Sequence, residues 1–109
     1  MFANLSKQEI KQIILNILKS MKMSVKDIIL FGSRARGDNK YNSDWDILII
    51  IKQKISFNKK REIARSIRKK LADSYVDADI IVKCQKEINY YKNFIGSVVR
   101  EALKDGVTL

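Results

Sequence analysis

Apolar residues recur at helical spacing near the start of the chain. Ser6 and Glu9 form the pattern of a capping box, and Leu5 and Ile10 are spaced to close a hydrophobic staple around it. Because residues three and four apart share one face of a helix, the stripe that follows predicts an amphipathic helix to about residue 22. The stripe contains Ile10, Ile13, Ile14, Ile17, Leu18 and Met21.

Two later segments show the same periodicity. Asn58 is a candidate N-cap for a strongly basic helix whose apolar face contains Ile63, Ile67 and Leu71. A last helix is expected over about 86–104, with Gly106 as its stop. The apolar face of this last helix is formed by Ile88, Tyr91, Ile95, Val98 and Ala102.

Short apolar runs between these helices predict strands at 27–31, 44–51 and 76–82. Glycines at 32 and 37 bracket a turn or the start of a short helix. The order helix, strand, turn, strand, helix, strand, helix predicts an α/β (α+β) fold, with a small three-stranded sheet flanked by helices. A chain of 109 residues is long enough for one core, so a single domain over 1–109 is expected.

Composition narrows the possible chemistry. The chain has no histidine, which excludes histidine triads, histidine metal ligands and imidazole acid–base catalysis. Its single cysteine, Cys84, allows no internal disulfide and fits a structural thiol in a reducing compartment. The formal charge of +10 favours a partner or substrate with phosphates or carboxylates, although solubility alone also explains it.

No segment has the length of a membrane span. The longest uninterrupted apolar run, Ile47 to Ile51, is far shorter than the roughly 20 residues that cross a bilayer. Charged and polar residues also interrupt the N-terminal region where a secretory signal would lie. A cytoplasmic location without membrane association is therefore expected.

Pairs of aspartates lie on two of the predicted strands. Asp44 and Asp46 share one face of the second strand, and Asp77 and Asp79 share one face of the third. Clustered carboxylates would raise one another's proton affinity unless a cation neutralised them. With oxygen ligands and no histidine, the natural cation is Mg²⁺ or Mn²⁺, which also binds substrate phosphates. A site shared by acids and phosphates is thus predicted.

The stretch "FGSRARGDNKYNSDWDILI" resembles the signature of the DNA polymerase beta type nucleotidyltransferase superfamily. The resemblance depends on a Gly-Ser pair followed, after ten residues, by Asp-x-Asp, here Gly32, Ser33, Asp44 and Asp46. It is strongest to the minimal nucleotidyltransferase branch, and "GSVVREALKDGVTL" is similar to the C-terminal helix of those stand-alone domains. The resemblance implies a mixed sheet of the polymerase beta palm type.

The resemblance also implies roles for individual residues. Gly32 and Ser33 would hold the β- and γ-phosphates of a nucleoside triphosphate, and Asp44 and Asp46 would bind two Mg²⁺ or Mn²⁺ ions. Asp79 is matched to the third carboxylate, with Asp77 as the alternative. The reaction would be attack of a hydroxyl on the α-phosphorus with release of pyrophosphate.

Other side chains have competing interpretations. Arg34 and Arg36 are candidates to bind phosphates or the acceptor, although loop arginines are often only solvated. Trp45 and the tyrosines Tyr41, Tyr90 and Tyr91 are expected to be packing residues. The basic helix is either a solvated face or a docking surface for an acidic partner or RNA.

Three functions follow from this resemblance. The first is transfer of a nucleoside monophosphate, AMP from ATP, to a hydroxyl of a protein or an RNA. The second is an antitoxin that binds a helical HEPN-type partner, which is compatible with adding AMP to that partner. The third is modification of an aminoglycoside, for which a chain of 109 residues is short.

Overall fold

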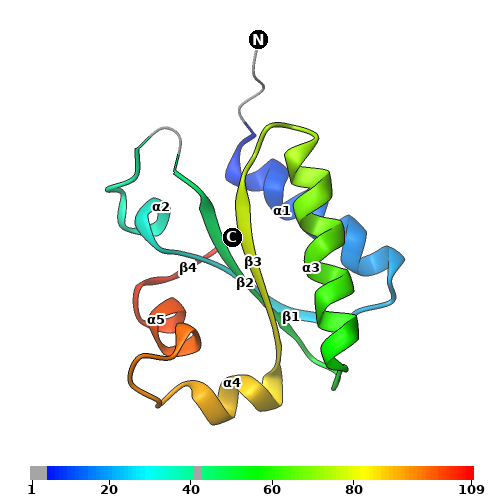
Figure 1. Cartoon of the computed structure of the whole chain (residues 1–109), viewed down its shortest axis with the longest axis vertical. Coiled ribbons are helices and arrows are strands. Elements are labelled where there is room, and N and C mark those ends of the chain that lie inside the picture. The colour runs from blue at the N-terminus through cyan, green and yellow to red at the C-terminus, as the bar shows by residue number, and fades with distance from the viewer. Residues whose placement is uncertain (1–4, 41–42) are drawn as a thin grey trace.

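Four strands form a mixed sheet at the centre of the molecule, with helices on both faces (Figure 1). The computed structural model describes residues 5–40 and 43–109. Within them the elements follow in the order α1 (Lys7–Ser20), β1 (Val25–Phe31), α2 (Ser33–Arg36), β2 (Trp45–Ile51), α3 (Phe57–Ala72), β3 (Ala78–Cys84), α4 (Gln85–Tyr91), α5 (Val98–Asp105) and β4 (Val107–Thr108). The predicted fold class is confirmed.

The sheet has the strand order β3-β2-β1-β4. β1 is antiparallel to both β2 and β4, whereas β2 and β3 are parallel. The C-terminal end of β1 therefore meets the N-terminal ends of β2 and β3 at one end of the sheet. At this end Asp46 lies opposite Phe31 on one side and opposite Asp79 on the other. We call this the acidic end of the sheet.

Apolar side chains alternate between the two faces of the sheet. Figure 1 shows α1 and α3 on one face and α2, α4 and α5 on the other. The α1/α3 face buries the larger cluster, to which the strands contribute Ile28, Leu30, Ile47, Ile49, Ile51, Ile80 and Val82. The opposite face buries Ile29, Leu48 and Ile50 against Ile88, Val99 and Ala102. The central strand β2 is thus apolar on both faces, as its continuous run of isoleucine and leucine requires.

The N-terminal helix follows its sequence pattern closely. Ser6 and Glu9 form the predicted capping box, in which each side chain accepts a hydrogen bond from the other residue's backbone N–H at 3.1 Å. Ile10, Ile14 and Leu18 are buried, which places the predicted stripe against the sheet.

The start of the basic helix was predicted wrongly. Ser56, not Asn58, is the N-cap of α3, and its hydroxyl accepts a hydrogen bond from the Lys59 N–H. Both side chains can cap a helix. The earlier one does so here, which leaves Asn58 inside the first turn.

The prediction of one continuous last helix is also wrong. α4 ends at Tyr91 and α5 begins at Val98, and Gly96 between them has a φ of +84°, which is incompatible with a continuous helix. Ser97 then caps α5 by accepting a hydrogen bond from the Arg100 N–H. Ile95, which the helical pattern placed on the apolar face, is 89% exposed.

A fourth strand was missed because it contains only Val107 and Thr108, too few residues for a pattern. These residues pair with Leu30 and Ile29 of β1. Gly106 does end α5, but its φ of −76° is not left-handed. A Cβ at this position would overlap the Ile29 side chain and the carbonyl of Ala102, so glycine is required for close packing.

Smaller differences concern strand limits and single residues. β1 begins at Val25, two residues earlier than predicted, and β3 is shifted two residues towards Cys84. Cys84 is buried, as expected for a structural thiol. Tyr41 lies outside the described residues. No helix among those described is long and apolar enough to span a membrane.

Candidate active site

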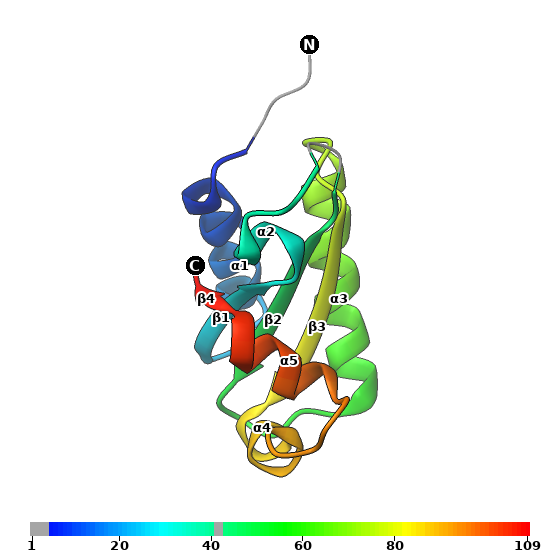
Figure 2. The same ribbon diagram turned by 90° about the vertical axis from the view of Figure 1, so that its left-hand side faces the viewer.

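The aspartates of the predicted site lie at the acidic end of the sheet. Asp46 is near the start of β2, and Asp79 is its direct neighbour in the parallel register with β3. Asp44 precedes β2 immediately and is exposed. Successive side chains of a strand point to opposite faces of the sheet, and Ile47 and Ile80, which follow the two aspartates, pack against α1 and α3. Asp46 and Asp79 therefore lie on the other face, which carries α2 and α5 (Figure 2).

The electrostatics of Asp46 reflect this crowding. Partial burial raises the pKa of the Asp46 carboxyl, and the negative charges of Asp79 and Asp44 raise it further. The positive charge of Arg36 opposes this shift without cancelling it. Loss of the Asp46 proton is therefore unfavourable in the protein without metal, and a bound cation would remove this cost.

Gly32 connects β1 to this group of acids. Its φ of +74° lies in the region that favours glycine, and a Cβ on it would overlap the carboxylate of Asp46. Any other residue would meet both a backbone cost and a steric clash. The backbone of Gly32 thus packs directly against the Asp46 carboxylate, with no room for a side chain between them.

Ser33 begins the short helix α2 directly after this glycine. The first N–H groups of a helical turn have no preceding helical carbonyl and point out of its start. Gly37 closes the turn with a φ of +82°, donating its N–H to the Ser33 carbonyl. α2 lies beside the end of β1 and the start of β2 in Figures 1 and 2.

The two arginines of the motif point to different surroundings. Arg36 is exposed, forms an ion pair with Asp38 at 3.2 Å and influences Asp46 electrostatically. Arg34 instead donates two hydrogen bonds to the Ser43 carbonyl, at 2.7 and 3.0 Å. Its guanidinium also lies over the Trp45 ring, 4.6 Å from the ring centroid. Sequence reasoning missed this contact, for which the only signal was an aromatic residue between two acids.

Asp77 lies apart from this arrangement. It precedes β3 and is exposed, and its backbone carbonyl accepts a hydrogen bond from the Trp45 N–H at 2.9 Å. Asp77 does not contribute to the raised pKa of Asp46. Asp77 directly precedes β3, which starts at Ala78, whereas Asp79 lies within the strand opposite Asp46.

The donor chemistry of the site fits a hard divalent cation. The charges of Asp44 and Asp79 both act on the Asp46 carboxyl, and oxygen is the ligand that Mg²⁺ and Mn²⁺ prefer. Within residues 5–40 and 43–109, no three acidic or cysteine side chains converge closely enough to form a ready metal-binding group. The carboxylates are thus near neighbours that would have to draw together around an ion.

Comparison with known proteins agrees with this geometry. The sequence model of the family described as "Nucleotidyltransferase domain" matches residues 11–108. A Methanocaldococcus jannaschii protein that carries the name protein adenylyltransferase is 35% identical over 104 residues, covering 91% of this chain and 97% of the relative.

Solved structures show the same fold. A nucleotidyltransferase structure from Sulfolobus solfataricus has a TM-score of 0.61 and 25% identity, covering 90% of this chain and 73% of that one. A complex of MNT antitoxin with tri-AMPylated HEPN toxin from Shewanella oneidensis gives a TM-score of 0.52 and 18% identity, covering 94% and 71%. With nearly its whole length matched, the chain belongs to the nucleotidyltransferase domain family and is a nucleotidyltransferase.

Proposed function

We propose that this chain transfers AMP from ATP to a hydroxyl group of a partner protein, with the help of divalent metal. The observation that carries the proposal is the contact between Gly32 and Asp46 beside Asp79. A glycine turn that can approach phosphates and a set of acids that can bind a cation meet at one end of the sheet. The name of the archaeal relative supports a protein as the acceptor.

Asp44, Asp46 and Asp79 would hold two Mg²⁺ or Mn²⁺ ions. When bound, these ions would neutralise the phosphate charge and lower the pKa of the attacking hydroxyl. Asp79 is preferred to Asp77 as the third ligand because it lies beside Asp46 in the sheet and acts on its pKa. Asp79 would also accept the proton of the acceptor hydroxyl while the hydroxyl oxygen forms its bond to the α-phosphorus.

The turn after β1 would bind the triphosphate. The backbone of Gly32, with the hydroxyl and N–H of Ser33, would hold the β- and γ-phosphates, which leave together as pyrophosphate. Arg36 is exposed on the same side as Asp46 and would add positive charge at the phosphates. Arg34 is engaged with Ser43 and Trp45, so we assign it to positioning the segment that carries Asp44.

We further propose a HEPN-type helical protein as the partner, which makes this chain its antitoxin. Support comes from the solved complex of an MNT antitoxin with an AMPylated HEPN toxin. That structure is similar in fold to this chain. A binding antitoxin that transfers nothing is the alternative.

The test offers labelled ATP and Mg²⁺ to the purified chain with three acceptors side by side. These are the protein encoded by the neighbouring gene, bulk tRNA, and an aminoglycoside. We expect label only in the protein, on a hydroxyl side chain, and none with Asp46→Asn. Label in tRNA or in the antibiotic alone would replace the proposed acceptor. Binding of the protein without any label would favour the non-catalytic antitoxin.

A further inference from the structure

A positively charged groove of about 410 Å³ lies between α3 and β3. Ala64, Ile80 and Val82 form its apolar floor, which belongs to the sheet face opposite the aspartates. Its rim consists of Lys60, Arg61, Arg65, Arg68 and Lys83, and no acidic residue lines it. We call it the α3–β3 groove.

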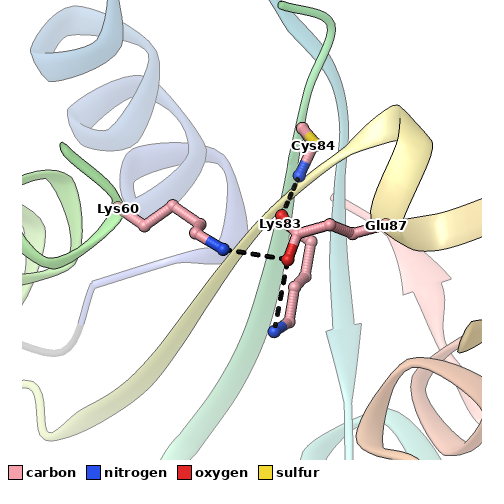
Figure 3. A network of polar contacts seen from close by, with 4 residues as sticks. All are labelled: Lys60, Lys83, Cys84 and Glu87. Atoms are coloured by element: carbon pink, nitrogen blue, oxygen red, sulfur yellow. Dashed lines mark hydrogen bonds and ion pairs between the residues drawn. The ribbon is translucent and has the colours of Figure 1, made fainter. Parts of the chain in front are cut away.

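The positive charge in this groove is uneven along its length. At one end, Glu87 neutralises the rim by contacting Lys60 at 2.8 Å and Lys83 at 3.8 Å (Figure 3). Towards the other end, Arg65 and Arg68 have no acidic partner among the described residues. Spacings of three and four residues place Arg61, Arg65 and Arg68 on one side of α3. Arg68 lies in the C-terminal part of α3, which leads into β3, so the unneutralised part of the groove extends towards the acidic end of the sheet.

The other wall of the groove is an unpaired strand edge. β3 is the outermost strand, and no described residue pairs with its outer side. Its seven residues extend over about 23 Å and present backbone N–H and C=O groups to any extended chain. Addition of a strand to such an edge is a common way to bind a peptide.

From these features we infer that the α3–β3 groove binds an extended acidic segment of the acceptor protein. The segment would add to the outer edge of β3, with apolar side chains over Ile80 and Val82 and carboxylates facing Arg65 and Arg68. A polypeptide suits this surface better than a single-stranded nucleic acid, which needs aromatic platforms. The only aromatic residue lining the groove is Phe57, and the Arg61 guanidinium already lies 5.8 Å from its ring centroid.

The inference rests on the proposed function only for the identity of the bound protein. A segment lying along β3 would pass the position of Asp79 at the start of the strand. Docking in the groove would thereby bring a neighbouring hydroxyl of the same protein to the acidic end of the sheet.

Fluorescence titration of the full chain tests the groove directly. The probe is a labelled peptide as long as β3 in which glutamate alternates with valine. Matched probes are a lysine–valine peptide and an oligouridylate of the same charge as the acidic peptide. We expect the acidic peptide to bind most tightly. Tighter binding of the oligouridylate would overturn the inference in favour of a nucleic-acid surface.

Two charge-matched variants locate the binding. Arg65→Gln with Arg68→Gln should weaken peptide binding at least about tenfold, because both charge-assisted contacts to the peptide carboxylates would be lost. Lys69→Gln with Lys70→Gln removes the same charge from exposed positions of α3 outside the groove and should change affinity less than about threefold. Equal losses of peptide affinity in both variants would show only a general attraction between charges and would overturn the inference that the groove binds the peptide.

Hydrogen exchange of backbone amides tests the added strand. Amides of residues 78–84 should exchange more slowly with the acidic peptide bound, and unchanged exchange there would contradict strand addition. Neither measurement requires AMP transfer, and Asp46→Asn should bind the peptide as the original protein does. A chain that binds the peptide in the groove but labels no protein supports the groove and contradicts only the proposed function.

Discussion

At the scale of single residues, Asp46 is where the charge of the site concentrates. Its pKa is raised by burial and by Asp79 and Asp44, so ionising it makes the folded state less favourable. A carboxyl whose folded pKa exceeds its unfolded value contributes full stability below the unfolded pKa, about 3.8. That contribution is lost as the pH rises through the folded pKa. Neutral pH is thus the range in which the acidic end is strained without metal.

We therefore predict that Asp46→Asn raises the melting temperature at pH 7 in EDTA, and that the gain disappears near pH 3. Activity should fall more than about a hundredfold, because loss of a metal ligand removes several kcal/mol of transition-state stabilisation. Thermal unfolding across this pH range and labelled-ATP assays provide the two readouts. Asp77→Asn is the control, since Asp77 does not act on Asp46. An equal thermal gain in both variants would argue against a specific cluster.

Gly32 and Gly37 give a second prediction at this scale. Both have a left-handed φ, but only Gly32 lacks room for a side chain. Replacing either by alanine should cost roughly 1–2 kcal/mol of unfolding free energy for the backbone alone. Gly32→Ala should cost more than Gly37→Ala, because its Cβ would displace the Asp46 carboxylate. Urea unfolding measures both, and equal losses would mean that the close approach is easily relieved.

At the scale of the elements, the start of a helix depends on which of several nearby polar side chains caps it. Ser56 and Asn58 are both capping residues, and the hydrogen bond from Lys59 shows which one caps α3. Gly96 and Ser97 similarly divide a segment whose apolar periodicity continues across the break. Periodicity describes where a helix could run, whereas capping and backbone strain decide where it does.

Ser56→Ala should accordingly reduce the unfolding free energy by about 1 kcal/mol, the usual contribution of an N-cap hydrogen bond. Asn58→Ala should change it by less than about 0.5 kcal/mol, as for an ordinary helix position. The pair of variants is compared by chemical denaturation at neutral pH. A larger loss for Asn58→Ala would place the start of α3 two residues later.

At the scale of the whole molecule, the candidate site depends on three strand ends that the sheet brings together. Gly32 directly follows β1, whereas Asp46 and Asp79 are the second residues of β2 and β3, so the antiparallel and parallel pairings place all three at one end of the sheet. The groove between α3 and β3 and the outer edge of β3 remain available for a partner. The acidic end and the α3–β3 groove thus share one strand while facing different directions.

This arrangement predicts that ATP binds only together with a divalent cation. The triphosphate and the three aspartates repel each other at close range unless an ion lies between them. Calorimetric titration with Mg²⁺ should show binding that EDTA reduces by at least about tenfold, a difference of about 1.4 kcal/mol. Affinity that is the same in both solutions would place the nucleotide away from the aspartates.

The sequence by itself determined the elements that local patterns control. The capping box at Ser6, the stripes of the first and the basic helix, and the three longer strands depend on neighbours a few residues apart, and the structure reproduces them. Spacing also singled out Gly32, Ser33, Asp44 and Asp46, because a close turn followed by alternating acids is a local signal. The structure places these residues at one end of the sheet.

Only the tertiary structure decided which distant residues meet. The two-residue strand β4 exists because β1 offers it an edge, and no short pattern can encode that. The register between β2 and β3 puts Asp79 beside Asp46, whereas Asp77 precedes the strand. The alternation of residues along the sequence could not distinguish the two aspartates. The contacts of Arg34 with the Ser43 carbonyl and the Trp45 ring likewise join residues that are about ten positions apart in the sequence. Each of these outcomes depends on contacts between segments, whose energies are set by the assembled sheet rather than by adjacent residues.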